Sequence, residues 1–126
     1  MPGKMKVTIY HNPNCGTSRN ALAAIRAAGH EPRIIEYLRT PPTRQELKDL
    51  LALMKVGVRD VVRKKEPLFS KLGLDARDVG EDELLDAMIA NPVLINRPIV
   101  VTEVAARLCR PSESVKGLLL TEGRQP

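Results

Sequence analysis

The sequence is poor in aromatic residues: two tyrosines and one phenylalanine occur among its 126 residues, and tryptophan is absent. We therefore expect a core of aliphatic side chains. The lack of aromatic rings also argues against a surface that stacks the bases of single-stranded nucleic acid. Lysine and arginine exceed aspartate and glutamate by 20 to 15 but form no run of five, so we expect no nucleic-acid partner. The net charge of +5 then indicates either an ordinary solvated surface or a small anionic substrate.

Long apolar segments are missing as well. The first residues lack the pattern of a secretory leader, and no apolar run reaches the roughly 18 residues that can cross a membrane. We therefore expect a cytoplasmic protein that contacts no membrane. The only two cysteines are Cys15 and Cys109, and in a reducing compartment we expect no structural disulfide. We also expect no bound metal and no bound cofactor.

The hydrophobic pattern predicts three parts. The first is a β-α-β unit, with strands at 6–10 and 33–38 and a helix at 18–28 that stops at Gly29. The second part is helical. Its helices are expected at 43–54, which opens with a capping box, and at 58–65, 67–72 and 81–89. The third part is a hairpin of strands 98–102 and 105–109, then a helix from Pro111-Ser112 and a frayed tail at 123–126.

Without its helical part, this order of elements is that of the thioredoxin-like fold. We therefore predict an α/β protein with a four-stranded mixed sheet and flanking helices. One thioredoxin-like domain is expected to cover residues 1–126. Loops of some fifty residues are rarely structureless, so we expect residues from about 41 to 92 to form a helical insertion between the β-α-β and β-β-α halves.

Cys15 lies between the first strand and the first helix, in the segment HNPNCGTSR (residues 11–19). Unpaired amides and the helix dipole favour an anion there, and therefore thiolate over thiol. Gly16 lets a ligand approach the backbone, and the hydroxyls of Thr17 and Ser18 can cap the helix and hydrogen-bond the sulfur. A structural core cysteine would not usually have such polar neighbours. We therefore predict a reactive thiolate that acts on a small oxyanion.

The spacing around Cys15 excludes two related chemistries. Ser18 stands where a Cys-x-x-Cys motif has its second cysteine, so the motif holds no resolving thiol. Arg19 follows Cys15 by four residues, whereas the phosphatase loop has its arginine six residues after the cysteine. The second thiol must therefore come from another molecule, unless Cys109 moves in.

Further residues are candidates for the same site. A protonated His11 could stabilise the thiolate, or it could simply be a strand-end histidine bound to a carbonyl. Arg63 is expected in the helix at 58–65, while Arg97 and Arg110 each precede a proline, which favours extended backbone. Guanidinium groups bind tetrahedral oxyanions bidentately. In a thioredoxin-like fold a cis proline opens the hairpin beside the active cysteine, and Pro98 would then carry Arg97 to that position.

Three segments together resemble the glutaredoxin-coupled arsenate reductases of the thioredoxin-like superfamily. They are HNPNCGTSRN at residues 11–20, INRPIVVT at 95–102 and LCRPSE at 108–113. The resemblance extends from about residue 6 to 120. It implies a cytoplasmic enzyme that reduces arsenate to arsenite, with glutathione as co-substrate and glutaredoxin as partner.

The resemblance also implies a role for each matching residue. Cys15 would attack arsenate, and His11 and Ser18 would support its thiolate. The arginines would hold the oxyanion; they are Arg63, Arg97 and Arg110. Since the electrons would come from external thiols, Cys109 is expected to be a structural strand residue.

Two other functions stay open at this point. The chain could be a reductase-like protein that acts on another oxyanion, because arginines alone do not separate arsenate from ions of the same shape and charge. It could also be a non-enzymatic adaptor, since relatives in the superfamily bind RNA polymerase and control transcription. Those relatives usually carry a Cys-x-x-Cys switch, which Ser18 interrupts here.

Overall fold

The computed structural model describes residues 6–123, with side chains for residues 6–119. Its contacts divide the chain into two compact units. One unit holds the residues up to Thr40 and those from Arg97 onward, and the other holds Pro41–Asn96. Apart from Gly123, the tail expected at 123–126 lies outside the described residues. Within the described part of the chain, no helix is long and apolar enough to span a membrane.

The first unit is built on a four-stranded sheet. β1 (Thr8–His11) lies between β2 (Arg33–Glu36), to which it is parallel, and β3 (Ile99–Val101), to which it is antiparallel. β4 (Ala106–Leu108) pairs antiparallel with β3, so the strand order is β2-β1-β3-β4. This mixed sheet confirms the predicted fold class and the hairpin.

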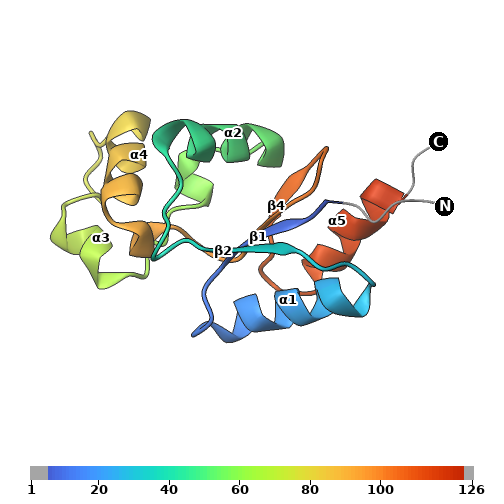
Figure 1. The fold of residues 1–126 in the computed structure, drawn as a ribbon. Helices are drawn as coiled ribbons and strands as arrows, with labels where there is room; N and C mark the ends of the chain where they lie inside the picture. The colour runs from blue at the N-terminus through green and yellow to red at the C-terminus, as the bar shows by residue number, and fades with distance from the viewer. Residues whose placement is uncertain (1–5, 124–126) are drawn as a thin grey trace. The chain divides into compact units, whose positions relative to one another are not determined.

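Two helices cover one face of this sheet. α1 (Gly16–Ala27) and α5 (Ser114–Gly123) lie side by side beneath it in Figure 1. Their buried side chains join those of β1 and β3 in one aliphatic cluster, as the scarcity of aromatic residues predicts. The members of that cluster are Val7, Ile9, Ala21, Ile25, Val100, Cys109, Val115, Leu118 and Leu119. Gly29 ends α1 with φ +91°, in the left-handed region that glycine adopts readily.

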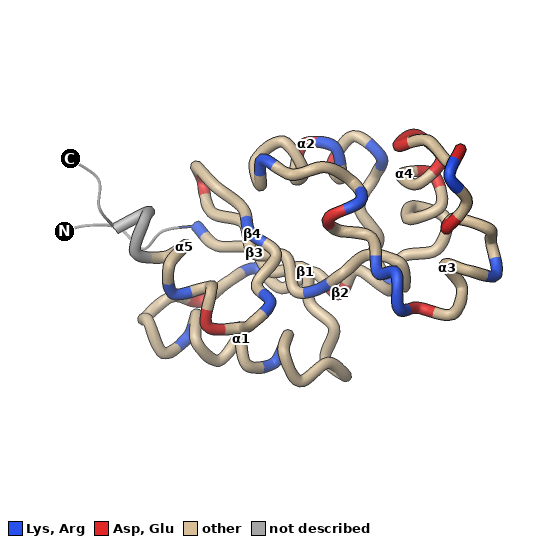
Figure 2. Tube along the Cα trace, turned by 180° about the vertical axis from the view of Figure 1, so that it is seen from behind, with Lys and Arg blue, Asp and Glu red and all other residues tan. Residues whose placement is uncertain are grey.

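The second unit consists of helices. They are α2 (Arg44–Met54), η1 (Val58–Asp60), α3 (Pro67–Lys71), α4 (Glu81–Ala90) and η2 (Pro92–Leu94), the η elements being 3-10 turns. The predicted capping box is confirmed: the Thr43 hydroxyl accepts from the Glu46 amide at 3.1 Å, and the Thr43 amide donates to Glu46 Oε1 at 2.8 Å. The acidic first turn of α4 (red in Figure 2) also receives Arg44 of α2, whose Nη2 lies 2.7 Å from Asp82 Oδ1.

The helix predicted at 58–65 is wrong beyond its first turn. Only Val58–Asp60 is helical, as a 3-10 turn, and Arg63 lies in a loop. The backbone of this segment bonds elsewhere: Val62 forms an antiparallel bridge with Ile95, and the Arg63 amide donates to the Leu94 carbonyl at 2.7 Å. These long-range hydrogen bonds replace the local ones that a helix would make.

Candidate active site

The register of the strands brings three chain segments together at one end of the sheet. Tyr10 of β1 pairs with Ile99 of β3, and Ile99 pairs with Leu108 of β4. The residues that follow β1, precede β3 and follow β4 therefore meet at the same end of the sheet. Those residues include Cys15, Arg97 and Arg110, all from the first unit.

Cys15 is the N-cap residue of α1, with extended backbone at φ −104° and ψ 121°. Its amide donates to the Asn12 carbonyl at 3.0 Å, and its carbonyl accepts the first helical hydrogen bond, from Arg19 at 2.9 Å. The amides of Gly16, Thr17 and Ser18 come before that first bond, so they are available to the sulfur or to an anion. α1 thus begins two residues earlier than predicted, and no hydroxyl of Thr17 or Ser18 caps it, because Cys15 occupies the cap.

The surroundings of Cys15 favour the thiolate. Burial, which leaves the residue 8% exposed, acts to raise the pKa of its thiol. The hydrogen bond from the Ser18 backbone amide, the charge of Arg97 and hydrogen bonds from Arg97 and Arg110 act in the other direction. They prevail, so the pKa of Cys15 lies below its ordinary value.

Arg97, which precedes β3, and Arg110, which follows β4, approach the sulfur at the open end of the hairpin. The Arg97–Pro98 peptide bond is cis, as expected, and the Arg110–Pro111 bond is cis as well. Nη1 of Arg110 lies 4.0 Å from Cys15 Sγ and donates to the Arg97 carbonyl at 2.9 Å. The two predicted arginines are therefore held beside each other at the cysteine.

Arg63 belongs to the second unit. Its Nη1 lies 3.0 Å from Glu66 Oε2, in an ion pair within the loop before α3. Its part in the site stays a prediction.

His11 and Ser18, which flank Cys15 in the sequence, form a buried hydrogen-bonded pair. His11 Nδ1 lies 2.6 Å from Ser18 Oγ, and that hydroxyl also accepts from the Asn12 amide at 3.1 Å. Ser18 therefore supports the sulfur through its amide, and its hydroxyl faces His11 and Asn12, unlike the sequence expectation. Burial lowers the pKa of His11, Glu36 raises it, and Arg19 and Arg26 lower it further; the net direction is down. A neutral imidazole follows, so the positive charge at the sulfur comes from arginine.

Sequence reasoning missed Asn12, which uses three groups to shape the turn before Cys15. Its carbonyl accepts from the Cys15 amide, its amide donates to Ser18, and its Oδ1 accepts from the Asn14 amide at 2.9 Å. An asparagine before proline is a frequent signal for such a turn, and this signal could have identified it.

Cys109 has a structural place in the aliphatic core, as predicted, but it directly follows β4 and is not itself in a strand. It is fully buried, and its thiol donates to the Arg107 carbonyl at 3.6 Å. Burial raises the pKa of Cys109 to about 11, against smaller opposing effects from Ser114 and Arg107. A protonated thiol in the aliphatic cluster is unsuited to resolve a bond formed at Cys15.

The buried Cys109 thiol gives a prediction for alkaline pH. The pKa of Cys109 in the folded protein, about 11, exceeds the ordinary 9.0. The contribution of the protonated thiol to the free energy of unfolding is therefore fully present below pH 9.0, and it is lost as pH rises through the folded pKa. Between these limits, wild type should lose about 2 to 3 kcal/mol more unfolding free energy than Cys109→Ala. Denaturant unfolding of both proteins at a series of pH values measures this difference. Parallel stability curves would contradict a buried neutral thiol.

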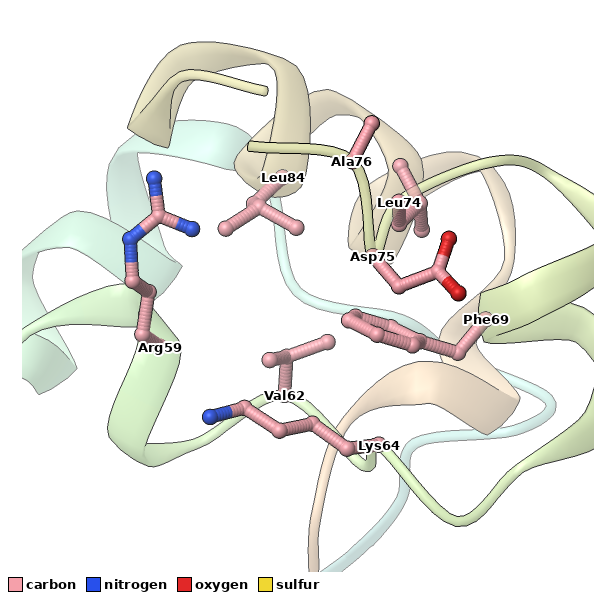
Figure 3. Close-up of a pocket in the computed structure, with 8 residues that line it drawn as sticks. All are labelled: Arg59, Val62, Lys64, Phe69, Leu74, Asp75, Ala76 and Leu84. Carbon is pink, nitrogen blue, oxygen red and sulfur yellow. The ribbon is translucent and has the colours of Figure 1, made fainter. Parts of the chain in front are cut away.

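The second unit has a pocket of about 240 Å³, shown in Figure 3. Its lining combines the charged side chains of Arg59, Lys64 and Asp75 with apolar ones that include Phe69 and Leu84. Cysteine is absent from its lining, so the thiol chemistry belongs to the first unit. Among the residues that the structure describes, no group of three or more histidine, cysteine or carboxylate side chains could hold a metal ion.

Comparison with known proteins identifies the family. The profile of the ArsC family matches residues 10–118. The chain is 54% identical over 115 residues to the arsenate reductase of Rhizobium meliloti (strain 1021), covering 91% of this chain and 82% of the relative. It is 55% identical over 113 residues to that of Escherichia coli (strain K12), covering 90% and 80%.

Solved structures agree with this match. An arsenate reductase from Vibrio cholerae superimposes with a TM-score of 0.88 at 42% identity, over 91% of this chain and 98% of that one. A putative arsenate reductase from Yersinia pestis gives a TM-score of 0.86 at 47% identity, over 89% and 99%. The profile match covers most of the chain, and the cysteine, its turn and the hairpin arginines lie within it. The chain belongs to the ArsC family.

Proposed function

We propose that this protein is an arsenate reductase whose nucleophile is the Cys15 thiolate. The observation that carries the proposal is the position of Cys15 at a helix N-terminus with Arg97 and Arg110 beside its sulfur, an arrangement that lowers the pKa of the thiol. A thiolate with two guanidinium groups is suited to bind a tetrahedral dianion and to attack its central atom. The identities of 54% and 55% to arsenate reductases support arsenate as that dianion.

The reaction starts when Cys15 Sγ bonds to arsenic and one arsenate oxygen leaves as water after protonation. The glutathione sulfur then bonds to the same arsenic as a second oxygen leaves as water. The glutaredoxin thiolate attacks the glutathione sulfur, and the sulfur–arsenic bond that breaks leaves its electron pair on arsenic. Arsenic gains two electrons, and the two external thiols lose them as they join in a mixed disulfide. Hydrolysis of the remaining sulfur–arsenic bond releases arsenite and returns Cys15. The lack of a second cysteine in the motif and the burial of Cys109 support external reductants.

The other residues of the site bind the oxyanion or orient the groups around the sulfur. Arg97 and Arg110 offset the charge of the oxyanion, and we assign Arg63 the same role. The amides of Gly16 and Thr17 precede the first helical hydrogen bond and are assigned to the oxyanion as well. The neutral His11 fixes the Ser18 hydroxyl, and this keeps the Ser18 amide aligned with the sulfur. The reaction needs neither a metal nor a bound cofactor, and we place it in the cytoplasm, where glutathione is reduced.

The adaptor alternative is weakened by the position of Ser18. In a Cys-x-x-Cys switch, a cysteine at this position would form a disulfide with the first cysteine. Here the position holds Ser18, which is fully buried and hydrogen-bonded to His11. Capture of RNA polymerase from lysate by the tagged protein, lost in Cys15→Ser, would instead favour an adaptor.

The proposal is tested by measuring arsenite produced from arsenate with glutathione and glutaredoxin both present. We expect turnover with the complete mixture and its loss when either thiol source is left out. Phosphate, selenate and vanadate in place of arsenate test the choice of oxyanion. No arsenite from the complete mixture would refute the proposal, and faster consumption of another oxyanion would reassign the substrate.

A further inference from the structure

The side chain of Arg19 makes contacts that neither the charge of the site nor the nucleophile explains. It lies in the first turn of α1, and its Nη1 donates to the Pro13 carbonyl at 2.8 Å. Its own amide donates to the Cys15 carbonyl at 2.9 Å. Arg19 thus donates two hydrogen bonds to the turn, one from its side chain to the carbonyl of Pro13 and one from its backbone to the carbonyl of Cys15.

The guanidinium also lies over Gly16. A Cβ added to Gly16 would stand 3.7 Å from Arg19 Nη2, an ordinary contact distance. The group therefore extends from the carbonyl of Pro13 to the backbone of Gly16, and Cys15 lies between these two points. Other exposed arginines also donate to backbone carbonyls, Arg107 and Arg110 among them, but Arg19 does so within the turn that holds Cys15.

Packing does little to hold this turn. Pro13, Asn14 and Gly16 are all exposed, so hydrogen bonds must fix its shape. Asn12 supplies those on the inner side, to the amides of Asn14 and Cys15. The Pro13 carbonyl on the outer side has its partner in Arg19.

We propose that Arg19 is a positioning residue, whose guanidinium holds the Pro13–Gly16 turn against α1 and keeps the amides after Cys15 directed at the sulfur and at the bound oxyanion. The part about the oxyanion rests on the proposed function. Electrostatic stabilisation by backbone amides depends on their being fixed before the reaction begins. A loosened turn would weaken the Ser18 amide bond to the sulfur and scatter the amides of Gly16 and Thr17.

A second effect of Arg19 acts on His11. The charged groups that face this imidazole are Glu36 of β2 and Arg19 and Arg26 of α1, and the two arginines oppose its protonation. The His11 imidazole is hydrogen-bonded to the Ser18 hydroxyl, in the first turn of the same helix. Arg19 therefore acts on both sides of the cysteine loop.

The test compares Arg19→Gln and Arg19→Lys with Arg33→Gln. Arg33 is exposed at the far end of β2, where it pairs with Thr8, and its side chain makes no hydrogen bond or ion pair with the described residues. This control removes the same charge without touching the turn. Three readouts are used: kcat/KM for arsenate, the pKa of Cys15 from thiolate absorbance, and hydrogen exchange of the amides at 15–18. The last two need no turnover, so they test the positioning role even if arsenate is not the substrate.

We expect Arg19→Gln to lower kcat/KM about tenfold, the size of one lost hydrogen bond to a charged group. It should also raise the pKa of Cys15 and speed amide exchange at 15–18, while Arg33→Gln leaves all three near wild type. Arg19→Lys keeps the charge and a donor near the length of arginine, whereas glutamine is uncharged and its amide donor sits on a shorter side chain, so Arg19→Lys should lie between Arg19→Gln and wild type. Equal losses of kcat/KM in Arg19→Gln and Arg33→Gln, with an unchanged Cys15 pKa, would overturn the proposal in favour of net charge alone. Wild-type behaviour of Arg19→Gln would overturn it outright.

Discussion

Cys15→Ser is expected to abolish arsenate reduction, with a loss of at least about a thousandfold in kcat. The serine hydroxyl stays protonated near neutral pH, so the bonds and charges that favour a thiolate at this position have no anion to act on. The change replaces one atom in a residue that is 8% exposed, so the fold should be kept. The measurement is arsenite production with glutathione and glutaredoxin in excess.

Cys109→Ala is the matched control for this loss, because it removes the other thiol of the chain. Cys109 lies in the aliphatic cluster and is protonated, so this variant should keep most of the activity. Unfolding curves of both variants establish that they are folded. An active Cys15→Ser protein, or an inactive but folded Cys109→Ala protein, would contradict the assignment of Cys15 as the nucleophile.

Arg97→Gln is expected to lower kcat/KM by about 10²- to 10³-fold, the usual cost of removing one donor that stabilises a developing anion. Arg97 acts on Cys15 through both its charge and a hydrogen bond. Its loss should therefore raise the pKa of Cys15 and shift the acid limb of the pH–rate profile to higher pH. Kinetics over a range of pH, together with titration of the thiolate, measure both effects.

Arg97→Lys separates charge from geometry at this position. Lysine keeps the positive charge but cannot form the planar fork of guanidinium, so we expect the Cys15 pKa to be largely restored and kcat/KM only partly. Full activity of Arg97→Gln would contradict a role for this arginine at the reacting atoms.

Much of the fold follows from local sequence signals. The alternating strands, the Thr43 capping box and the glycine after α1 all act within a few residues, and the structure keeps each of them. The segment at 58–65 differs because its hydrogen bonds are to residues 94–96, some thirty positions away. Local periodicity carries no information about such partners.

The site was predicted in its composition more than in its geometry. Cys15, Arg97 and Arg110 meet because the register of the hairpin places them at the same end of the sheet. The charge of His11 depends on its burial and on Arg19 and Arg26, which the sequence does not give. The contact of Arg19 with Pro13 depends on a side-chain conformation and was missed for the same reason.

The pKa of Cys15 in the free protein is the most direct test of this account. It is measured from thiolate absorbance during a pH titration of Cys109→Ala, where Cys15 is the one remaining thiol. The amide of Ser18 and the two hairpin arginines should hold the midpoint clearly below the ordinary 9.0. A midpoint at or above 9.0 would show that burial outweighs them, and it would contradict a nucleophile prepared as thiolate.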